Sequence, residues 1–270
     1  MIERELSNQA SIYLSDAERA HEDARTEERS AHDQMADAEA AMAAATHHRS
    51  WWQRFLAVPS ADERIAATLV ARHTRAVIRA GRSIEQAEIA RAKAAQGSEG
   101  ELVLPTWFRT RLSDEWRMFQ GYRNNRGEID HLLLGPPGLW AVEVKTNRAK
   151  LRVYGDDWEL TRLDGGGNEV GRRQATDGGG RTWGRQVGEP AAVLARRLAA
   201  RSFEVPVRTA VLLVRPGARI VDVIKPGVDL VSAEIEEFDR AATAGPPILD
   251  HDQLAAIDEV IVEHHRQCQQ

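Results

Sequence analysis

The sequence predicts an α/β fold, a mixed sheet flanked by helices, preceded by an N-terminal helical hairpin or coiled coil. Apolar residues recur at helical spacing through much of residues 1–96. Short β-prone runs separated by turns follow at 115–163, and another helical run follows at 183–201. The run at 207–214 is almost wholly apolar, which is typical of a buried strand. This order of helix, three strands, helix and strand is that of a mixed sheet covered by helices.

Residues 1–96 are expected to form a helical assembly region. Residues 3–46 are polar, rich in alanine and free of glycine and proline, which favours one long helix. Ser60 and Glu63 have the spacing of a capping box, so a second helix is expected from there to about Ala95. Small apolar faces on both helices favour an antiparallel hairpin. Parallel coiled-coil dimerisation is the alternative, although the heptads are poor in Leu and Ile.

The composition argues against a membrane or secreted protein. No hydrophobic run approaches the ~20 residues that span a bilayer, and the first residues lack the apolar core of a secretory signal. An aromatic segment at 51–56 could touch a membrane surface, but we expect it to pack as an elbow against its own helices. The single cysteine, Cys268, cannot form an internal disulfide. The cytoplasm is therefore the expected compartment.

Two acidic strand segments carry most of the functional information. Residues 127–134 and 140–145 are both apolar, β-prone runs interrupted by charge, with Gly-Pro-Pro-Gly between them as a turn. Glu143 and Lys145 are two residues apart and therefore share a strand face. If the runs pair as a hairpin, Asp130 approaches Glu143, which places two carboxylates and an ammonium together. Unpartnered buried carboxylates are costly, so this arrangement calls for a function.

Carboxylate oxygens of this kind suit Mg²⁺ or Mn²⁺. A divalent ion held by Asp130 and Glu143 can activate water and offset the charge of a phosphodiester under attack. Lys145 is expected to polarise the water and to stabilise the developing negative charge. A plain salt bridge between Lys145 and Glu143 is the alternative interpretation. The acidic strands therefore predict a nuclease centre.

The sequence resembles the nuclease-related domain (NERD) family of the PD-(D/E)XK restriction-endonuclease-like superfamily. Asp130 followed by Glu143-Val144-Lys145 resembles the superfamily signature. Segments at 97–101 and 126–131 resemble the opening GxxGE and the central GEIDH segment of the family. The resemblance covers residues 97–270 and implies a restriction-endonuclease-like core.

The resemblance also implies roles for particular residues. Glu101 resembles an acidic residue on the first helix of related nucleases, and Gln186 resembles the glutamine of the family's later helix, although the proline that often precedes it is absent. The metal would be held by the side chains of two residues and the backbone carbonyl of a third, namely Asp130, Glu143 and Val144. The implied catalytic residues are Asp130, Glu143, Lys145, Glu101 and Gln186.

Several other features are given no catalytic role. His131 should point to the strand face opposite Asp130, and Glu128 is a weaker candidate on the same face as Asp130. The glycine runs at 165–167 and 178–180 lack the Gly-Lys-Ser/Thr of a phosphate loop. The histidines have no partners at the spacing of a zinc site.

The charge is unevenly distributed along the chain. The net charge is −5, yet residues 51–230 contain 29 bases and 21 acids, or +8. Residues 1–50 have 5 bases and 11 acids, and residues 231–270 have 2 bases and 9 acids. The basic block contains the predicted site, as a phosphate-binding enzyme needs. The alternative is that much of this arginine is solvated helix surface.

The sequence thus predicts a Mg²⁺- or Mn²⁺-dependent nuclease, most concretely a DNA endonuclease, with a role in defence against foreign DNA. A homo-oligomer or a partner protein is expected to assemble through residues 1–96, and no membrane partner is expected. The alternative is a scaffold or sensor that binds nucleic acid without cutting it. A third hypothesis is a coiled-coil assembly factor whose α/β domain is only structural.

Overall fold

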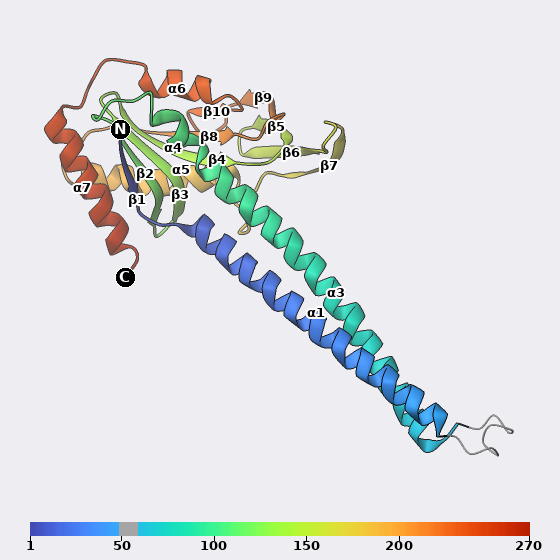
Figure 1. Cartoon of the computed structure of the whole chain (residues 1–270). Helices are drawn as coiled ribbons and strands as arrows, with labels where there is room; N and C mark the ends of the chain where they lie inside the picture. The colour runs from blue at the N-terminus through green and yellow to red at the C-terminus, as the bar shows by residue number, and fades with distance from the viewer. Residues whose placement is uncertain (49–58) are drawn as a thin grey trace. The chain divides into compact units, whose positions relative to one another are not determined.

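The computed structural model describes residues 1–48 and 59–270, so the predicted aromatic elbow lies outside the described residues. The chain forms two compact units (Figure 1). One unit combines Met1–Ala10 with Gln96–Gln270, and the other is Ser11–Ala95. The first ten residues therefore belong with the α/β unit and not with the helical region to which the sequence assigned them.

The helical unit consists of two antiparallel helices, α1 (Gln9–His47) and α3 (Ala61–Glu101). His21 near the start of α1 lies 3.7 Å from Glu88 near the end of α3. Further along, the Thr74 hydroxyl contacts the Met35 sulfur at 3.7 Å. The interior between the helices is built mainly of alanine, because the buried apolar side chains are Ala24, Ala31, Ala38, Ala66 and Ala80. Such small side chains let two helices pack closely but bury little apolar area.

The bounds of the helices differ from the predictions at both ends of this unit. The predicted helix start at residue 3 is wrong, because Ile2–Glu5 is a strand, β1. The capping box at the start of α3 is confirmed, since the Ser60 hydroxyl accepts from Glu63 N and the Glu63 carboxylate accepts from Ser60 N. Helix α3 does not end near residue 95 but continues to Glu101. Glu101 is therefore the last residue of this long helix.

The α/β unit contains a mixed six-stranded sheet in the order β1-β2-β3-β4-β8-β10. Strands β2, β3 and β4 are antiparallel, whereas the β1–β2, β4–β8 and β8–β10 pairs are parallel. This mixed sheet confirms the predicted fold class. The strands after β1 are β2 (Arg117–Asn124), β3 (Gly127–Gly135), β4 (Gly138–Lys145), β8 (Val207–Leu213) and β10 (Leu230–Ser232).

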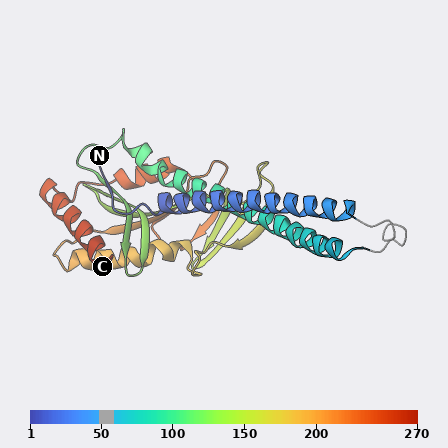
Figure 2. The ribbon, with the colours of Figure 1, turned by 60° about the horizontal axis from the view of Figure 1, so that its bottom comes forward.

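Helices cover both faces of this sheet (Figure 2). On one face, apolar side chains of α5 (Trp183–Ala199) and α7 (His251–Gln267) form the larger core cluster with the strands. On the other face, α4 (Val103–Phe108) and α6 (Ile235–Thr243) form the smaller cluster. No helix within residues 1–48 and 59–270 is long and apolar enough to cross a membrane.

A second, four-stranded sheet follows the main sheet in the order β7-β6-β5-β9. Its strands are β5 (Ala149–Tyr154), β6 (Asp157–Leu163), β7 (Glu169–Gln174) and β9 (Arg219–Ile224). Figure 1 shows β7 at its free edge. The sequence did not predict β7, because all six residues of this strand are exposed and it lacks the apolar alternation of a half-buried strand.

Candidate active site

The predicted hairpin of the two acidic segments is confirmed. Strands β3 and β4 pair antiparallel with His131 opposite Val142, so Asp130 lies one residue beyond that pair, on the side of Glu143. The Asp130 Oδ2 atom accepts a 2.7 Å hydrogen bond from the backbone N–H of Val144. The sheet register therefore sets Asp130 beside the strand that carries the Glu-Val-Lys sequence.

Lys145 contacts two predicted site residues. Its Nζ lies 2.5 Å from Glu143 Oε1 and donates a 3.0 Å hydrogen bond to Gln186 Oε1. Gln186 belongs to the first turn of α5, which begins after the N-cap Thr182 without the proline of the family pattern. The ring of Trp183, also at this helix start, has its centroid 5.4 Å from Lys145 Nζ. Helix α5 thus supplies an amide and an indole ring to the ammonium group.

Glu101 enters the site from the end of α3. Gly100 allows this close approach, because a Cβ at that position would lie 2.0 Å from the Thr146 side chain just beyond β4. The Gln96 side chain also donates a hydrogen bond to the Thr146 carbonyl. Burial, followed by the negative charge of Asp130, raises the pKa of the Glu101 carboxyl to about 7. This shift indicates that the Glu101 carboxyl shares one electrostatic environment with Asp130.

Burial disfavours the charged forms of both carboxyl groups of the hairpin. Burial and the nearby Asp130 raise the pKa of the Glu143 carboxyl to about 8, against the opposing effect of Lys145. Burial also raises the pKa of Asp130, although Lys145 and the Val144 N–H favour its charged form. Burial acts to lower the pKa of Lys145, but Glu143 and Asp130 outweigh it and raise that pKa. The site therefore holds a charged Lys145 beside buried carboxyl groups whose ionisation is disfavoured.

The donor atoms fit a small divalent cation. Glu143 Oε2 is buried and has no hydrogen-bond partner among the described residues. In a strand, the N–H and C=O of one residue point toward the same neighbour, so the Val144 carbonyl faces the Asp130 side as its N–H does. No group of three His, Cys, Asp or Glu side chains that could hold a metal occurs within the described residues. The oxygens that this site offers to a metal are those of two side-chain carboxylates and one backbone carbonyl.

Two neighbouring residues lie as the strand alternation predicts. His131 is fully buried on the face opposite Asp130, and burial lowers its pKa to about 4. Glu128 forms a 2.7 Å ion pair with Arg123 and accepts a 3.1 Å hydrogen bond from the Ser7 hydroxyl. Glu128 is thus already paired, although its charge also raises the pKa values of the site carboxyls.

The sequence missed the parts of the site that distant segments supply. Trp183 was assigned only to a helix, and nothing in the sequence places its ring under Lys145. Ser7 is 121 residues from Glu128 along the chain, so no local pattern reveals their hydrogen bond. The pairing of β1 with β2 brings Ser7 to this edge, and the mostly charged residues of β1 carry no strand pattern that would predict this pairing.

A mixed sheet covered by helices, with an acidic hairpin that ends in Glu-Val-Lys, defines a nuclease-like α/β domain. Residues 96–214 match the family model of the nuclease-related domain, NERD. This match covers a little under half of the chain, and the NERD family is grouped with the PD-(D/E)XK superfamily. The matched segment contains every predicted site residue. Comparisons with curated proteins and with solved structures gave no significant match.

Proposed function

We propose that this chain is a Mg²⁺-dependent endonuclease that hydrolyses phosphodiester bonds in DNA, and that Mn²⁺ can replace Mg²⁺. The observation that carries the proposal is the contact between Lys145 Nζ and Glu143 Oε1 on β4. The backbone N–H of Val144, the residue between them, donates a hydrogen bond to Asp130. This geometry occurs within the segment that matches the NERD family. Carboxylates of this kind can bind a divalent cation, and the adjacent ammonium can bind a phosphate oxygen, which together promote phosphodiester hydrolysis.

The proposed metal ligands are Asp130, Glu143 and the backbone carbonyl of Val144. The unpartnered Glu143 Oε2 supports this assignment, because a buried carboxylate oxygen without a partner is otherwise costly. When bound, Mg²⁺ would lower the pKa of a water molecule and offset charge on the scissile phosphate. Glu101 would contact the same site through water, since its carboxyl is close enough to Asp130 for their charges to interact.

Lys145 is the proposed group that contacts the reacting atoms. Its raised pKa keeps the amine protonated at neutral pH, so it acts as a hydrogen-bond donor and a positive charge rather than as a base. It can orient the attacking water and stabilise the added negative charge on the phosphorus oxygens. Gln186 accepts one Lys145 hydrogen and limits the directions in which the ammonium can point.

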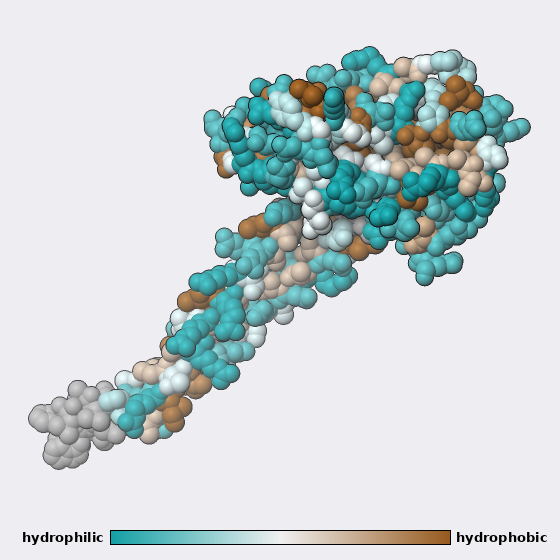
Figure 3. Space-filling view, turned by 180° about the vertical axis from the view of Figure 1, so that it is seen from behind, coloured by the Kyte–Doolittle hydropathy of each residue, from teal (hydrophilic) through white to brown (hydrophobic). Residues whose placement is uncertain are grey.

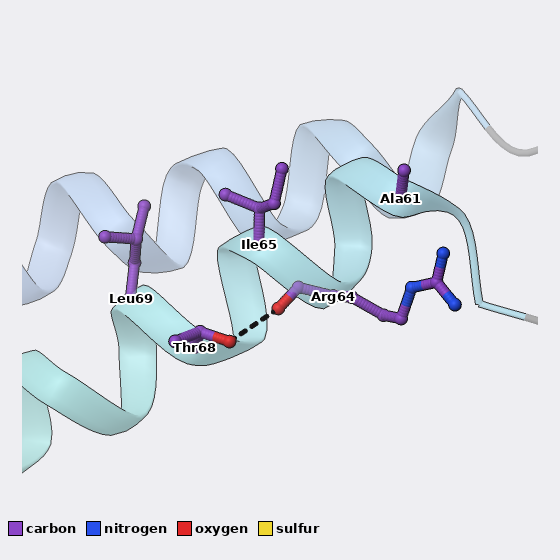
Figure 4. Close-up of a pocket in the computed structure, with 5 residues that line it drawn as sticks. All are labelled: Ala61, Arg64, Ile65, Thr68 and Leu69. Carbon is purple, nitrogen blue, oxygen red and sulfur yellow. Dashed lines mark hydrogen bonds between the residues drawn. The ribbon is translucent and has the colours of Figure 1, made fainter.

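The helical unit is proposed to assemble the protein with a second copy or a partner protein. Hydrophobic patches lie among the hydrophilic residues on the surface of this unit (Figure 3). A shallow apolar groove lies on α3, where Ile65 and Leu69 are 61% and 36% exposed. Ala61 lies beside them, and Arg64 and Thr68 also line the groove (Figure 4). The assembly region in this proposal is the helical unit, Ser11–Ala95. We further propose that the protein is cytoplasmic and acts in defence against foreign DNA.

The direct test compares the purified wild type with Lys145→Ala on plasmid, single-stranded DNA, duplex DNA and RNA. We expect the wild type to cut DNA with Mg²⁺ and not with EDTA, and Lys145→Ala to lose at least about 10³-fold in rate. Cleavage that is equally fast in EDTA, or that is unchanged in Lys145→Ala, would refute the assignment.

One observation favours a second candidate function, a scaffold or sensor that binds nucleic acid without hydrolysis. The 2.5 Å ion pair between Lys145 and Glu143 occupies the groups that the reaction needs. If this pair persists when Mg²⁺ and DNA are present, the protein binds DNA but leaves it intact. Retained DNA binding with no cleavage under any divalent cation would identify this case.

A further inference from the structure

A row of side chains crosses all four strands of the small sheet on one face. Lys150 on β5 pairs with Arg219 on β9 and with Thr161 on β6, and Thr161 pairs in turn with Arg172 on β7. Directly paired residues in a sheet share a face. Three of the four positions in this row are therefore basic and lie in line, perpendicular to the strands.

The row faces away from the protein core. The residues that alternate with it along β5 and β6 are Leu151, Val153, Trp158 and Leu160, and all four are fully buried in the larger core cluster. The side chains of Lys150 and Arg172 are 34% and 63% exposed, and Arg219 is exposed as well. The basic groups are thus available to a ligand in solution.

Arg148 lies next to the row, two residues before Lys150 along the chain and in the direction of Lys145. It follows Lys145 by three residues and directly precedes β5, where strand alternation places it on the same face as Lys150. Its guanidinium lies against Gly217, at which a Cβ would be 3.0 Å from Arg148 Nε. The Nε atom is buried without a hydrogen-bond partner among the described residues. We refer to Arg148, Lys150, Arg172 and Arg219 as the basic row.

Acidic side chains balance only part of this charge. Glu169 lies 2.9 Å from Lys150 and 3.8 Å from Arg172, so one carboxylate is shared between two cations. Arg148 and Arg219 form no ion pair with any residue that the structure describes. The four cations of the basic row thus share one carboxylate, whereas in the next row on the same face Arg152 is paired with Glu159 and Asp222.

We propose that the basic row binds the phosphate backbone of duplex DNA beside the bond that is cut. The proposal rests on the proposed function for the nature of the polymer. Three strand spacings of about 4.8 Å make the part from Arg172 to Arg219 about 14 Å long. One strand of a duplex presents about four phosphates over that length, at ~3.4 Å of axial rise each. Arginine forms bidentate hydrogen bonds with phosphate, which suits three of the four residues.

The test measures binding of the full-length protein to a labelled 30-base-pair DNA duplex in EDTA and in Ca²⁺, across a range of salt concentrations. The test variant is Arg172→Gln/Arg219→Gln. The matched control is Arg162→Gln/Arg173→Gln, which removes two exposed arginines from the same sheet at positions that alternate to its other face. Melting temperatures of both variants show whether the sheet remains folded.

We expect the test variant to bind DNA at least about tenfold more weakly, with the slope of log K against log salt reduced by about 2. The control variant should bind as the wild type does. Equal losses in both variants would overturn the proposal, since they would indicate a nonspecific effect of net charge. Equal affinities of wild type and test variant, or a wild type that binds no DNA in either buffer, would overturn it as well.

The same variants separate this proposal from the proposed function. If the wild type cleaves DNA and the test variant binds as tightly as the wild type, the proposed role of the basic row is refuted and the nuclease assignment stands. If no divalent cation supports cleavage but the test variant binds DNA more weakly than the wild type, the DNA-binding role of the basic row is supported and the nuclease assignment is wrong. Competition by duplex RNA, single-stranded DNA and anionic vesicles tests the choice of duplex DNA, and tighter binding to any of them would overturn that choice.

Discussion

The Asp130 carboxylate accepts a 2.7 Å hydrogen bond from the backbone N–H of Val144, the residue between Glu143 and Lys145. This bond ties the side chain of one strand to the backbone of the next at the point where their ladder of paired residues ends. It sets the carboxylate of Asp130 on the side where the Val144 carbonyl and the Glu143 carboxylate are also available. The position of the first carboxylate therefore depends on the register of the hairpin.

Asp130→Asn should abolish most Mg²⁺-dependent cleavage and leave the fold intact. The amide oxygen can still accept from Val144 N–H, but the substitution removes the negative charge that a divalent ion needs. We expect a rate loss of about 10³-fold or more, measured as initial rates of plasmid nicking. Glu128→Gln is the matched control, because this acid is on the same strand but is already paired with Arg123. An equal loss in both variants would argue against a ligand role specific to Asp130.

Mg²⁺ should stabilise the protein more at pH 8.5 than at pH 5.5. Burial raises the pKa of Glu143 to about 8 and that of Glu101 to about 7, from an ordinary value of 4.5. The contribution of these two carboxyl groups to the stability of the fold is therefore fully present below about pH 4.5. It is lost as pH rises through their folded-state pKa values of about 7 and 8, because the folded protein must then bury carboxylate charge. A bound cation favours the charged forms and should offset that loss.

Thermal melting in EDTA and in Mg²⁺ at several pH values measures this effect. The melting temperature in EDTA should fall between pH 5.5 and pH 8.5, and Mg²⁺ should reduce the fall. Glu143→Gln should flatten the dependence, since its amide does not ionise. A shift on adding Mg²⁺ that is the same at both pH values, or larger at pH 5.5, would contradict the prediction.

Gln186→Ala should lower kcat with little change in KM. Gln186 Oε1 accepts from Lys145 Nζ at 3.0 Å, so its loss leaves the ammonium paired only with Glu143. Because Gln186 positions Lys145, we expect a loss of about 10- to 100-fold, smaller than that of Lys145→Ala. In Lys145→Ala/Gln186→Ala the second substitution should have almost no further effect. Additive losses in the double variant would show that the two residues act independently.

Sequence reasoning succeeded where the determinants are local. The acidic hairpin could be predicted because its two strands and the Gly-Pro-Pro-Gly turn are continuous in the chain, and period-two alternation then fixed the face of Glu143 and Lys145. The capping box at Ser60 could be predicted from four consecutive residues. These elements depend on contacts between residues that are close in sequence.

Three features that the sequence did not reveal involve distant partners or missing burial. Strand β1 forms because Ile2 and its neighbours pair with β2, a segment far along the chain. Strand β7 forms at an edge with no buried side, so no hydrophobic period marks it. The contact between Gln186 and Lys145 depends on how α5 packs against the sheet. Tertiary packing overrides local propensity in each case.

Gly135→Ala should destabilise the α/β unit. A Cβ at this position, where β3 turns toward β4, would lie 2.2 Å from the Trp116 ring, which is itself buried. Overpacking of this kind costs about 1–3 kcal/mol in the free energy of unfolding. Gly165→Ala is the control, since nothing lies within 4 Å of its added Cβ. Urea denaturation measures both variants, and equal midpoints would show that the Trp116 ring can move aside.

Ile65→Glu/Leu69→Glu should reduce self-association if the groove on α3 is the assembly surface. The alanine-built interior of the helical unit buries little apolar area, whereas these two larger side chains are exposed. Two copies that pack through this groove would remove them from water, at about 25 cal/mol per Å² of apolar area. Ile78→Glu is the matched control, because Ile78 is 53% exposed and lies thirteen residues after Ile65, roughly on the other side of the same helix. Sedimentation velocity should show dimers for wild type and Ile78→Glu, and monomers for the groove variant. A wild type that is monomeric at every concentration would show that the groove does not bind a second copy, so that any occupant is a different protein. Dimers in all three samples would place the dimer contact elsewhere on the chain.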